Sequence, residues 1–303
     1  MEIVATPQAL RRQLAEQPTG PGGLALVPTM GNLHDGHLSL VRKALDSADT
    51  VAVSIFVNPM QFADGEDLDA YPRTLDRDIE LLTEAGADLL FTPNVDALYP
   101  QGLKTHTAVR VPGLTEVLCG RHRPGHFDGV TTVVCKLLNL VQPDIALFGE
   151  KDLQQLLVIE KMVADLAMPV RVEGVATARA EDGLALSSRN GYLSPDERDL
   201  APRLYASLLQ IRDAITTGAR DFQGLCADAV QGLEAEGFAV DYCELRRCDD
   251  LSLAQPAGSG GDRWVHNFGR LPGSDDRLRV VAVAAGASWF GEAGLTFMET
   301  PDQ

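Results

Sequence analysis

The chain has 303 residues, of which 45% are hydrophobic and 23% are charged, and this length and composition are typical of a soluble globular protein with two domains. Forty-three acidic residues against 26 basic ones give a formal net charge of −17, which excludes a general electrostatic attraction to nucleic acid or to an anionic membrane surface. The sequence shows no signal-peptide pattern, no run near the roughly 20 apolar residues of a membrane span, and no CxxC pair among its five cysteines. We therefore expect a cytoplasmic protein with reduced thiols.

The first 177 residues alternate short apolar runs with helical patterns. After a short strand and an amphipathic helix, the continuous apolar runs predicted to be parallel strands buried on both faces are LALV (24–27), VAVSIFV (51–57), ADLLFT (87–92), IALF (145–148) and VRVEGVAT (170–177). Helices are predicted between them at 73–86, 129–141 and 152–166, and the first of these carries Leu75, Ile79 and Leu82 on one face. This alternation predicts an α/β fold whose first domain, 1–177, contains a doubly wound, Rossmann-like parallel sheet.

The pattern changes after residue 178. Ser194 and Glu197 form a capping box, with Pro195 at the first helical position, and predict a helix over 194–215. A second helix is predicted from about 222 to 237, and strand-like runs follow at 238–245 and 278–286, separated by a loop rich in Gly, Pro, Ser and Asp at 255–277. Residues 178–303 are therefore expected to form a second, smaller α+β domain.

The stretch VPTMGNLHDGHLSLV (27–41) joins a predicted strand to a predicted helix. Parallel sheets bind ligands at the carboxyl ends of their strands, and the N-terminus of a helix attracts anions such as phosphate. His34 and His37, three residues apart, share one face of the first helical turn. Two partly buried histidines without a function, or a chance pair on the surface, are the alternative interpretations. Zinc is disfavoured, because zincin-type sites need the pattern HExxH.

Wider motifs decide between these interpretations. VPTMGNLHDGH resembles the HxGH signature of the nucleotidyltransferase superfamily. Together with FVNPMQF (56–62), YPRT (71–74), RPGHFDGV (123–130), FGEKDLQQL (148–156) and DGLALSSRNGYL (182–193), it is similar to the pantoate–β-alanine ligase family. The resemblance implies that ATP and pantoate form a pantoyl adenylate with release of pyrophosphate. Attack by the amine of β-alanine then releases pantothenate and AMP. It also implies Mg²⁺ bound with ATP, and a homodimer.

The resemblance assigns a role to individual residues. His37 is implied as the proton donor, with His34, Lys151 and Arg189 as further catalytic residues. The ATP-binding residues implied are Pro28, Thr29, Met30, Gly31, Asn32, Leu33, His34, Asp35, Gly36, His37, Gly149, Glu150, Lys151, Asp152, Ala178, Leu186, Ser187, Ser188 and Arg189. Pantoate is assigned to Met30, Gln61, Arg123 and Gln155, β-alanine to Gln61, and the metal ion to Asp78, acting through water.

Alternatives remain open for several of these residues. Considered singly, Lys151 reads as a solvated helix start, Arg189 as a surface ion pair and Asp152 as a helix cap. Ala178 is smaller than the valine that is usual in the family, and Arg77 stands where members often carry an acid. The rival functions are another HxGH adenylyltransferase, acting on phosphopantetheine or nicotinamide mononucleotide, and a nucleotide-binding scaffold without activity.

Overall fold

The computed structural model of the protein describes residues 1–16, 20–63, 65–247, 250–255, 278–283 and 294–296. Packing divides the chain into two compact units, which are described separately: Met1–Glu150 with Gln154–Val175, and Lys151–Leu153 with Ala176–Gln303. The loop expected at 255–277, apart from its first residue, lies outside the described residues, as does the end of the last expected strand. No described helix is both long and apolar enough to cross a membrane.

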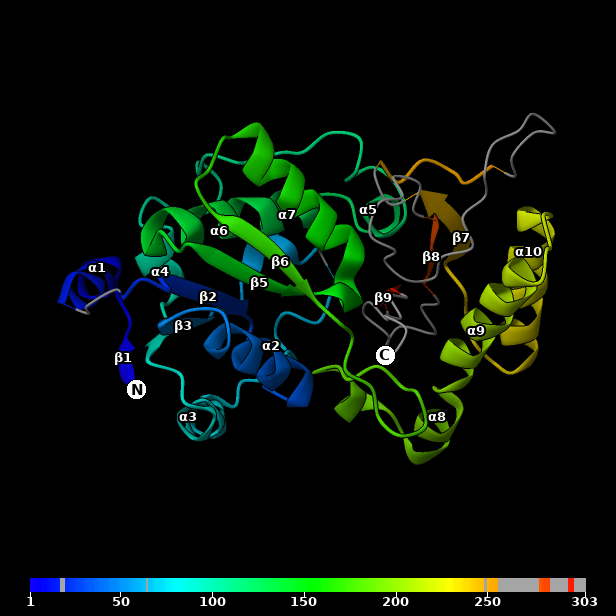
Figure 1. The fold of residues 1–303 in the computed structure, drawn as a ribbon, viewed down its shortest axis with the longest axis horizontal. Helices are drawn as coiled ribbons and strands as arrows, with labels where there is room; N and C mark the ends of the chain where they lie inside the picture. Colours follow the sequence, from blue (N-terminus) through cyan, green and yellow to red (C-terminus); the bar gives the residue numbers. More distant parts are fainter. Residues whose placement is uncertain (17–19, 64, 248–249, 256–277, 284–293, 297–303) are drawn as a thin grey trace. The chain divides into compact units, whose positions relative to one another are not determined.

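The first unit is built on a six-stranded sheet in the order β1-β4-β3-β2-β5-β6 (Figure 1). The strands, taken in that order, are Glu2–Val4, Leu89–Phe91, Thr50–Ile55, Leu24–Thr29, Ile145–Gly149 and Arg171–Val175. Every neighbouring pair is parallel. The predicted α/β fold with a Rossmann-like parallel sheet is therefore confirmed.

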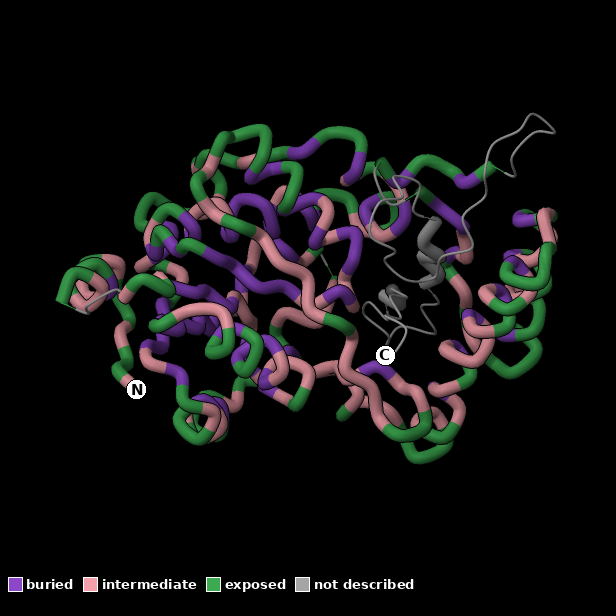
Figure 2. Tube along the Cα trace, in the orientation of Figure 1, coloured by how far each residue is buried: buried purple, intermediate pink, exposed green. Residues whose placement is uncertain are grey.

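Helices cover both faces of this sheet (Figure 1). The helices of the first unit are α1 (Pro7–Glu16), α2 (Asp35–Leu45), α3 (Leu75–Ala85), α4 (Val95–Leu98), α5 (Cys119–His122), α6 (His126–Val141) and, from its second residue, α7 (Leu153–Asp165), with the 3₁₀ turn η1 (Pro59–Gln61). The 3₁₀ turn η2 (Glu150–Asp152) crosses the boundary between the two units in the chain. Helix α2 follows β2 and α7 follows β5, and right-handed crossovers in opposite directions place them on opposite faces. The central strands are buried along most of their length (Figure 2), because side chains from both layers pack on them.

Two expectations for the first unit were wrong in detail. Strand β6 is not buried on both faces: Arg171 is exposed and the other residues of the strand are half-buried, because β6 is the edge of the sheet. On α3, Leu75 is 39% exposed, whereas Asp78 is only 1% exposed. The hydrophobic pattern could not place Asp78 inside, since a carboxylate is buried only where it finds hydrogen-bond donors.

The second unit combines helices with a small antiparallel sheet in the order β7-β8-β9. Its elements are η3 (Asn190–Tyr192), α8 (Pro195–Leu200), α9 (Arg203–Thr216), α10 (Phe222–Ala235), β7 (Tyr242–Arg247), β8 (Leu278–Val283) and β9 (Gly294–Thr296). Its core contains Leu208, Ile211, Leu233 and Leu245.

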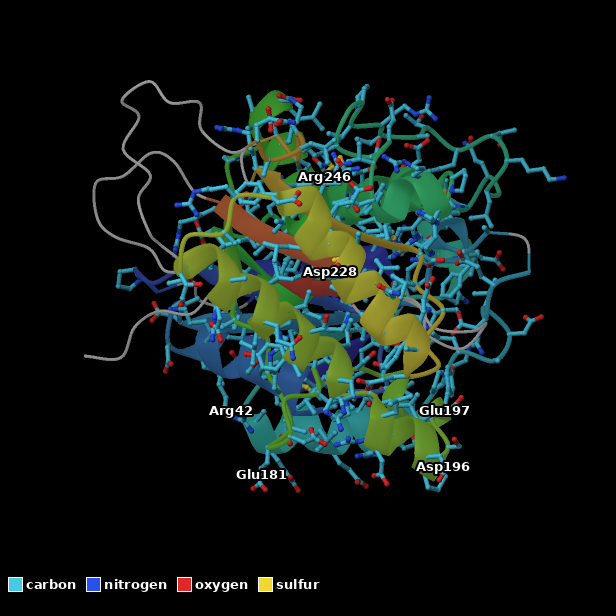
Figure 3. All side chains as sticks on the ribbon, turned by 90° about the vertical axis from the view of Figure 1, so that its right-hand side faces the viewer. Arg42, Glu181, Asp196, Glu197, Asp228 and Arg246 are labelled. Carbon is cyan, nitrogen blue, oxygen red and sulfur yellow. The ribbon has the colours of Figure 1, made fainter. Side chains whose placement is uncertain are left out.

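The start of α8 agrees with the sequence pattern, but its length does not. The backbone N–H of Glu197 donates to Ser194 Oγ over 3.3 Å, and the N–H of Ser194 donates to the Glu197 carboxylate over 2.8 Å, so the capping box is present. Glu197 and its neighbour Asp196 are labelled in Figure 3. The single helix expected over 194–215 is two helices, with the break at Ala201–Pro202. Proline has no N–H to donate and its ring crowds the preceding turn, which ends α8 there.

Candidate active site

The turn after β2 lies where the winding of the sheet reverses. Strand β2 is between β3 and β5, and the chain proceeds from β2 to β3 on one side while β5 and β6 extend the sheet on the other. Such a reversal leaves the carboxyl ends of β2 and β5 uncovered by crossover connections, and doubly wound sheets bind ligands there. The predicted ATP residues Pro28 to His37 run from the end of β2 into the first turn of α2.

The backbone of this turn is held by a buried carboxylate. Asp78 accepts hydrogen bonds from the N–H groups of Asn32 and Leu33, over 2.9 and 2.8 Å, and from the hydroxyl of Thr74 over 3.2 Å. Asn32 has φ of 50° and Gly31 has φ of 82°, a backbone region that is unfavourable for a side chain. The positive φ of Asn32 makes this turn unfavourable by itself, and the hydrogen bonds to the Asp78 carboxylate stabilise it.

These contacts bear on the expected metal role of Asp78. Both of its carboxylate oxygens are occupied by hydrogen bonds from the protein, and the residue is almost fully buried, so it does not fit a direct metal ligand. Among the residues that the structure describes, no group of three or more His, Cys, Asp or Glu side chains could hold a metal ion. The water-mediated role stays a prediction, and the contacts show that Asp78 also positions the turn.

His34 and His37 cap the N-terminus of α2 reciprocally. His34 Nδ1 accepts from the N–H of Gly36 over 3.1 Å, and His37 Nδ1 accepts from the N–H of His34 over 3.3 Å. The ring centroids are 4.1 Å apart. A nitrogen that accepts a hydrogen bond carries no proton, so in each neutral ring the proton is on Nε2. The cap thus makes both Nε2–H groups donors, which is the arrangement that phosphate oxygens require.

Gln61 lies on η1, which is fixed by polar groups that the sequence analysis missed. Asn58 donates from Nδ2 to the carbonyl of Gly129 over 3.0 Å, and the hydroxyl of Tyr99 donates to Asn58 Oδ1 over 3.0 Å. A Cβ at Gly129 would lie 2.1 Å from the carbonyl oxygen of Met60, so only glycine permits this approach of α6 to η1. Asn58 and Gly129 belong to the quoted motifs, whereas nothing in the sequence singles out Tyr99.

Arg123, expected at pantoate, supports the same turn. Its guanidinium donates to both oxygens of Glu66, over 2.8 and 2.6 Å, and from Nη1 to His126 Nε2 over 3.3 Å. His126 Nδ1 in turn donates to the carbonyl of Gln61 over 2.7 Å. Burial raises the pKa of Glu66, but the hydrogen bond and charge of Arg123 outweigh it, and the net pKa is lowered. A pantoate contact for Arg123 stays a prediction.

The end of β5 leads into η2 and α7. Gly149 and the buried Glu150 are followed by Lys151, whose ammonium lies 3.1 Å from Asp152 Oδ1. On α7 the two neighbouring glutamines differ. Gln154 is buried and its amide is used by the backbone, donating to the carbonyls of Leu114 and Val117 and accepting from the N–H of Cys119. Gln155 is half-buried, on another face of the helix.

The predicted residues from Ala178 to Arg189 lie on one connected segment of the second unit. The N–H of Leu186 donates to the carbonyl of Ala178 over 2.9 Å, closing a hairpin that leads directly to Ser187, Ser188 and Arg189. The N–H of Arg189 donates to Ser187 Oγ over 3.3 Å. The structure therefore brings Ala178 and Leu186 side by side, with the Ser-Ser-Arg triplet next in the chain.

Comparison with known proteins identifies the family. The family model described as pantoate–β-alanine ligase matches residues 2–267. The chain belongs to this family. It is 55% identical over 265 residues to a pantothenate synthetase of Pseudomonas aeruginosa strain UCBPP-PA14, covering 88% of this chain and 92% of that one.

Solved structures of the family agree with this assignment. Pantothenate synthetase from Thermus thermophilus is 44% identical, with a TM-score of 0.83 and 98% of each chain covered. The pantoate–β-alanine ligase of Francisella tularensis, complexed with beta-gamma ATP and β-alanine, is 28% identical, with a TM-score of 0.75 and coverage of 98% of this chain and 96% of that one.

We predict that Asp78→Asn lowers the free energy of unfolding by about 1–3 kcal/mol, because the amide nitrogen of asparagine cannot accept a backbone N–H. Urea unfolding measures the change, and amide hydrogen exchange at Asn32 and Leu33 should become faster. Asp76→Asn, on the exposed side of the same helix, is the matched control and should stay within about 0.5 kcal/mol of the wild type. Equal unfolding free energies for the two variants would contradict the anchoring role of Asp78.

Proposed function

We propose that the protein condenses pantoate with β-alanine at the expense of ATP, through a pantoyl adenylate, releasing pyrophosphate and then AMP with pantothenate. The observation that carries this proposal is the reciprocal cap of His34 and His37 at the reversal point of the sheet, in a chain that belongs to the pantoate–β-alanine ligase family. The solved complex of the Francisella relative with beta-gamma ATP and β-alanine supports the same substrates for this chain.

In the first step a carboxylate oxygen of pantoate forms a bond to the α-phosphorus of ATP, while the bond from that phosphorus to the bridging oxygen breaks and pyrophosphate leaves. Negative charge grows on the phosphate oxygens and on the leaving group. The Nε2–H groups of His37 and His34, with the N-terminus of α2, donate hydrogen bonds to that charge. Since the cap fixes both rings before ATP arrives, little reorganisation is needed in the transition state.

In the second step the amine of β-alanine attacks the acyl carbon, the C–O bond to AMP breaks, and the amine loses a proton. Gln61 is proposed to meet both pantoate and β-alanine. Asn58 and the Arg123–His126 pair hold the turn that carries Gln61. The backbone position of Gln61 is therefore fixed, and only its side chain has to be oriented. Such fixed placement is how an enzyme converts a bimolecular reaction into an effectively unimolecular one.

The remaining assignments follow the family resemblance. ATP is proposed to contact Pro28 to His37, Gly149 to Asp152, Ala178, and Leu186 to Arg189, with Lys151 and Arg189 as cationic partners of its phosphates. Mg²⁺ is proposed to enter with ATP as part of that substrate. We further propose that 1–177 bind the nucleotide and pantoate, that 178–303 form a smaller α+β lid domain, and that the protein is a cytoplasmic homodimer.

The direct test is pantoate-dependent exchange of labelled pyrophosphate into ATP with β-alanine absent. We expect exchange with pantoate and none without it, because adenylation is reversible and needs no amine. Exchange driven by a nucleotide or by phosphopantetheine would indicate another HxGH adenylyltransferase. No exchange with any acid would indicate a nucleotide-binding scaffold, and both outcomes would contradict the proposal.

We predict that His37→Ala lowers the adenylation rate by about 10²-fold or more, as expected for the loss of a donor aimed at developing charge. Single-turnover formation of pyrophosphate measures the rate. Ser39→Ala, in the next turn of α2, is the control and should keep nearly the full rate. Thermal unfolding of both variants separates catalysis from stability. A decrease of less than about threefold for His37→Ala would refute the role.

We predict that Gln155→Ala and Gln61→Ala each raise the pantoate KM about tenfold or more, because a hydroxyl left unpaired in a dry pocket costs about 1–3 kcal/mol. The ATP KM should change little. Gln154→Ala is the contrasting variant: its amide serves the backbone, so it should lower the unfolding temperature instead. A pantoate KM equal to that of the wild type in both Gln155→Ala and Gln61→Ala would rule out this pantoate site. It would do so even if the protein proved to be a pantoate–β-alanine ligase.

A further inference from the structure

The hairpin that precedes the Ser-Ser-Arg triplet is short and tightly bonded. Ala180 N–H donates to the carbonyl of Leu184 over 2.8 Å, Gly183 N–H donates back to the carbonyl of Ala180 over 2.9 Å, and Arg179 pairs with Ala185 in an antiparallel bridge. Asn190 Nδ2 donates to the carbonyl of Ala185 over 3.0 Å. Residues 178–190 are therefore expected to move as one piece.

This piece carries two groups of proposed ATP contacts. Ala178 and Leu186 are hydrogen-bonded to each other at its base, and Ser187 to Arg189 follow immediately. Because the groups share one hairpin, anything that fixes the orientation of the hairpin fixes the spacing between them. The contacts of the hairpin with α8 and α9 therefore decide where these ATP contacts lie within the second unit.

Arg179 makes one of these contacts, with Tyr205 on α9. Its guanidinium carbon lies 3.8 Å from the centroid of the Tyr205 ring on α9, and its Nη1 donates to the carbonyl of Gly183 over 3.2 Å. Burial lowers the pKa of the Arg179 guanidinium, and the Tyr205 side chain acts against that shift. An arginine remains protonated in proteins, so the ring faces a partly desolvated cation, the setting in which cation–π attraction is strongest.

Gly183 is needed for the stack of Arg179 on Tyr205, because it leaves room for the ring beside the hairpin. Its φ is 93°, and a Cβ there would lie 2.7 Å from Cδ1 of Tyr205, so only glycine lets the hairpin tip approach the ring. A second attachment, the ion pair of Asp182 with Arg198 at 2.6 Å, is exposed on both sides and contributes little. Glu181, at the tip, projects from the molecule in Figure 3 and is exposed.

We propose that Arg179 and Tyr205 are positioning residues for ATP: their stack fixes the hairpin, and thereby the ATP contacts at Ala178, Leu186 and the Ser187–Arg189 triplet. The inference rests on the proposed function, because it needs the hairpin to meet ATP. Neither residue has to touch the nucleotide. Their effect should therefore fall on ATP use and spare pantoate binding.

The test compares Arg179→Met and Tyr205→Leu, which remove the stack, with Tyr205→Phe, which keeps the ring. We expect the first two to raise the ATP KM about five- to tenfold, in line with a desolvated cation–π contact, while the pantoate KM stays within about twofold. Tyr205→Phe keeps the ring and loses only the hydroxyl, so its ATP KM should stay within about threefold of wild type. Glu181→Ala and Arg198→Ala are controls on the same hairpin and α8, and both should behave as wild type.

A second measurement does not depend on catalysis. Amide hydrogen exchange at Leu186 and Asn190 should be faster in Arg179→Met and Tyr205→Leu, and unchanged in Tyr205→Phe and Glu181→Ala. Thermal unfolding of every variant shows whether the loss is confined to the hairpin. Equal increases in the ATP and pantoate KM, unchanged exchange at these amides, or equal damage from Tyr205→Phe and Tyr205→Leu would each overturn the inference.

The results that would contradict the proposed function differ from those that would contradict the positioning role of Arg179 and Tyr205. If the wild type catalysed no pantoate-dependent pyrophosphate exchange, that proposal would fail, and calorimetric ATP affinity would replace the KM values. Weaker ATP binding by Arg179→Met and Tyr205→Leu, with normal binding by Tyr205→Phe and Glu181→Ala, would still support the positioning role. Unchanged affinity in all four variants would overturn it.

Discussion

The hydrogen bonds from Asn32 and Leu33 to the carboxylate of Asp78 are the interaction on which the candidate site depends. They hold a turn in which Asn32, two residues before the N-cap His34, has a positive φ, and that cap orients both histidine rings. If the turn relaxed, His34 would lose its N-cap geometry and His37 its bond to the His34 backbone. A buried carboxylate on α3 thus prepares the two proposed phosphate donors through the backbone of the turn, without being one of those donors itself.

Around the proposed pantoate residues, too, some side chains hold the backbone while others are proposed to contact the substrate. His126 and Arg123 hold the backbone of Gln61, and the amide of Gln154 joins α7 to the carbonyls of Leu114 and Val117. Gln61 and Gln155, the two glutamines among the residues proposed to meet pantoate, therefore each have a polar neighbour whose hydrogen bonds go to the backbone. Buried amides and ions are expensive unless fully satisfied, so these networks favour one arrangement of the site over many.

Much of the fold could be predicted from the sequence, because the buried strands LALV, VAVSIFV and IALF are continuous apolar runs and the capping box at Ser194 has a clear pattern. The errors have physical causes. The edge position of β6 depends on strand order, which local pattern does not contain. The burial of Asp78 depends on donors 45 and 46 residues away in the chain. The single helix expected over 194–215 is divided because Pro202 lies inside it, and the capping box at Ser194 marks only where the first of the two helices begins.

The motifs of the site could be found from the sequence, but not the task of each residue within them. In GEKDLQQL the two glutamines are identical in type and adjacent, yet successive helical residues differ in direction by about 100°, so one amide enters the core and the other does not. In RPGHFDGV the arginine and histidine hold a backbone carbonyl that lies 62 and 65 residues earlier in the chain. A motif therefore records residues that substrates contact together with residues that keep those contacts in place, and only three-dimensional hydrogen bonding separates the two. For that reason Arg179, which in sequence is merely the cation before a turn, gains a role once its stack on Tyr205 is seen.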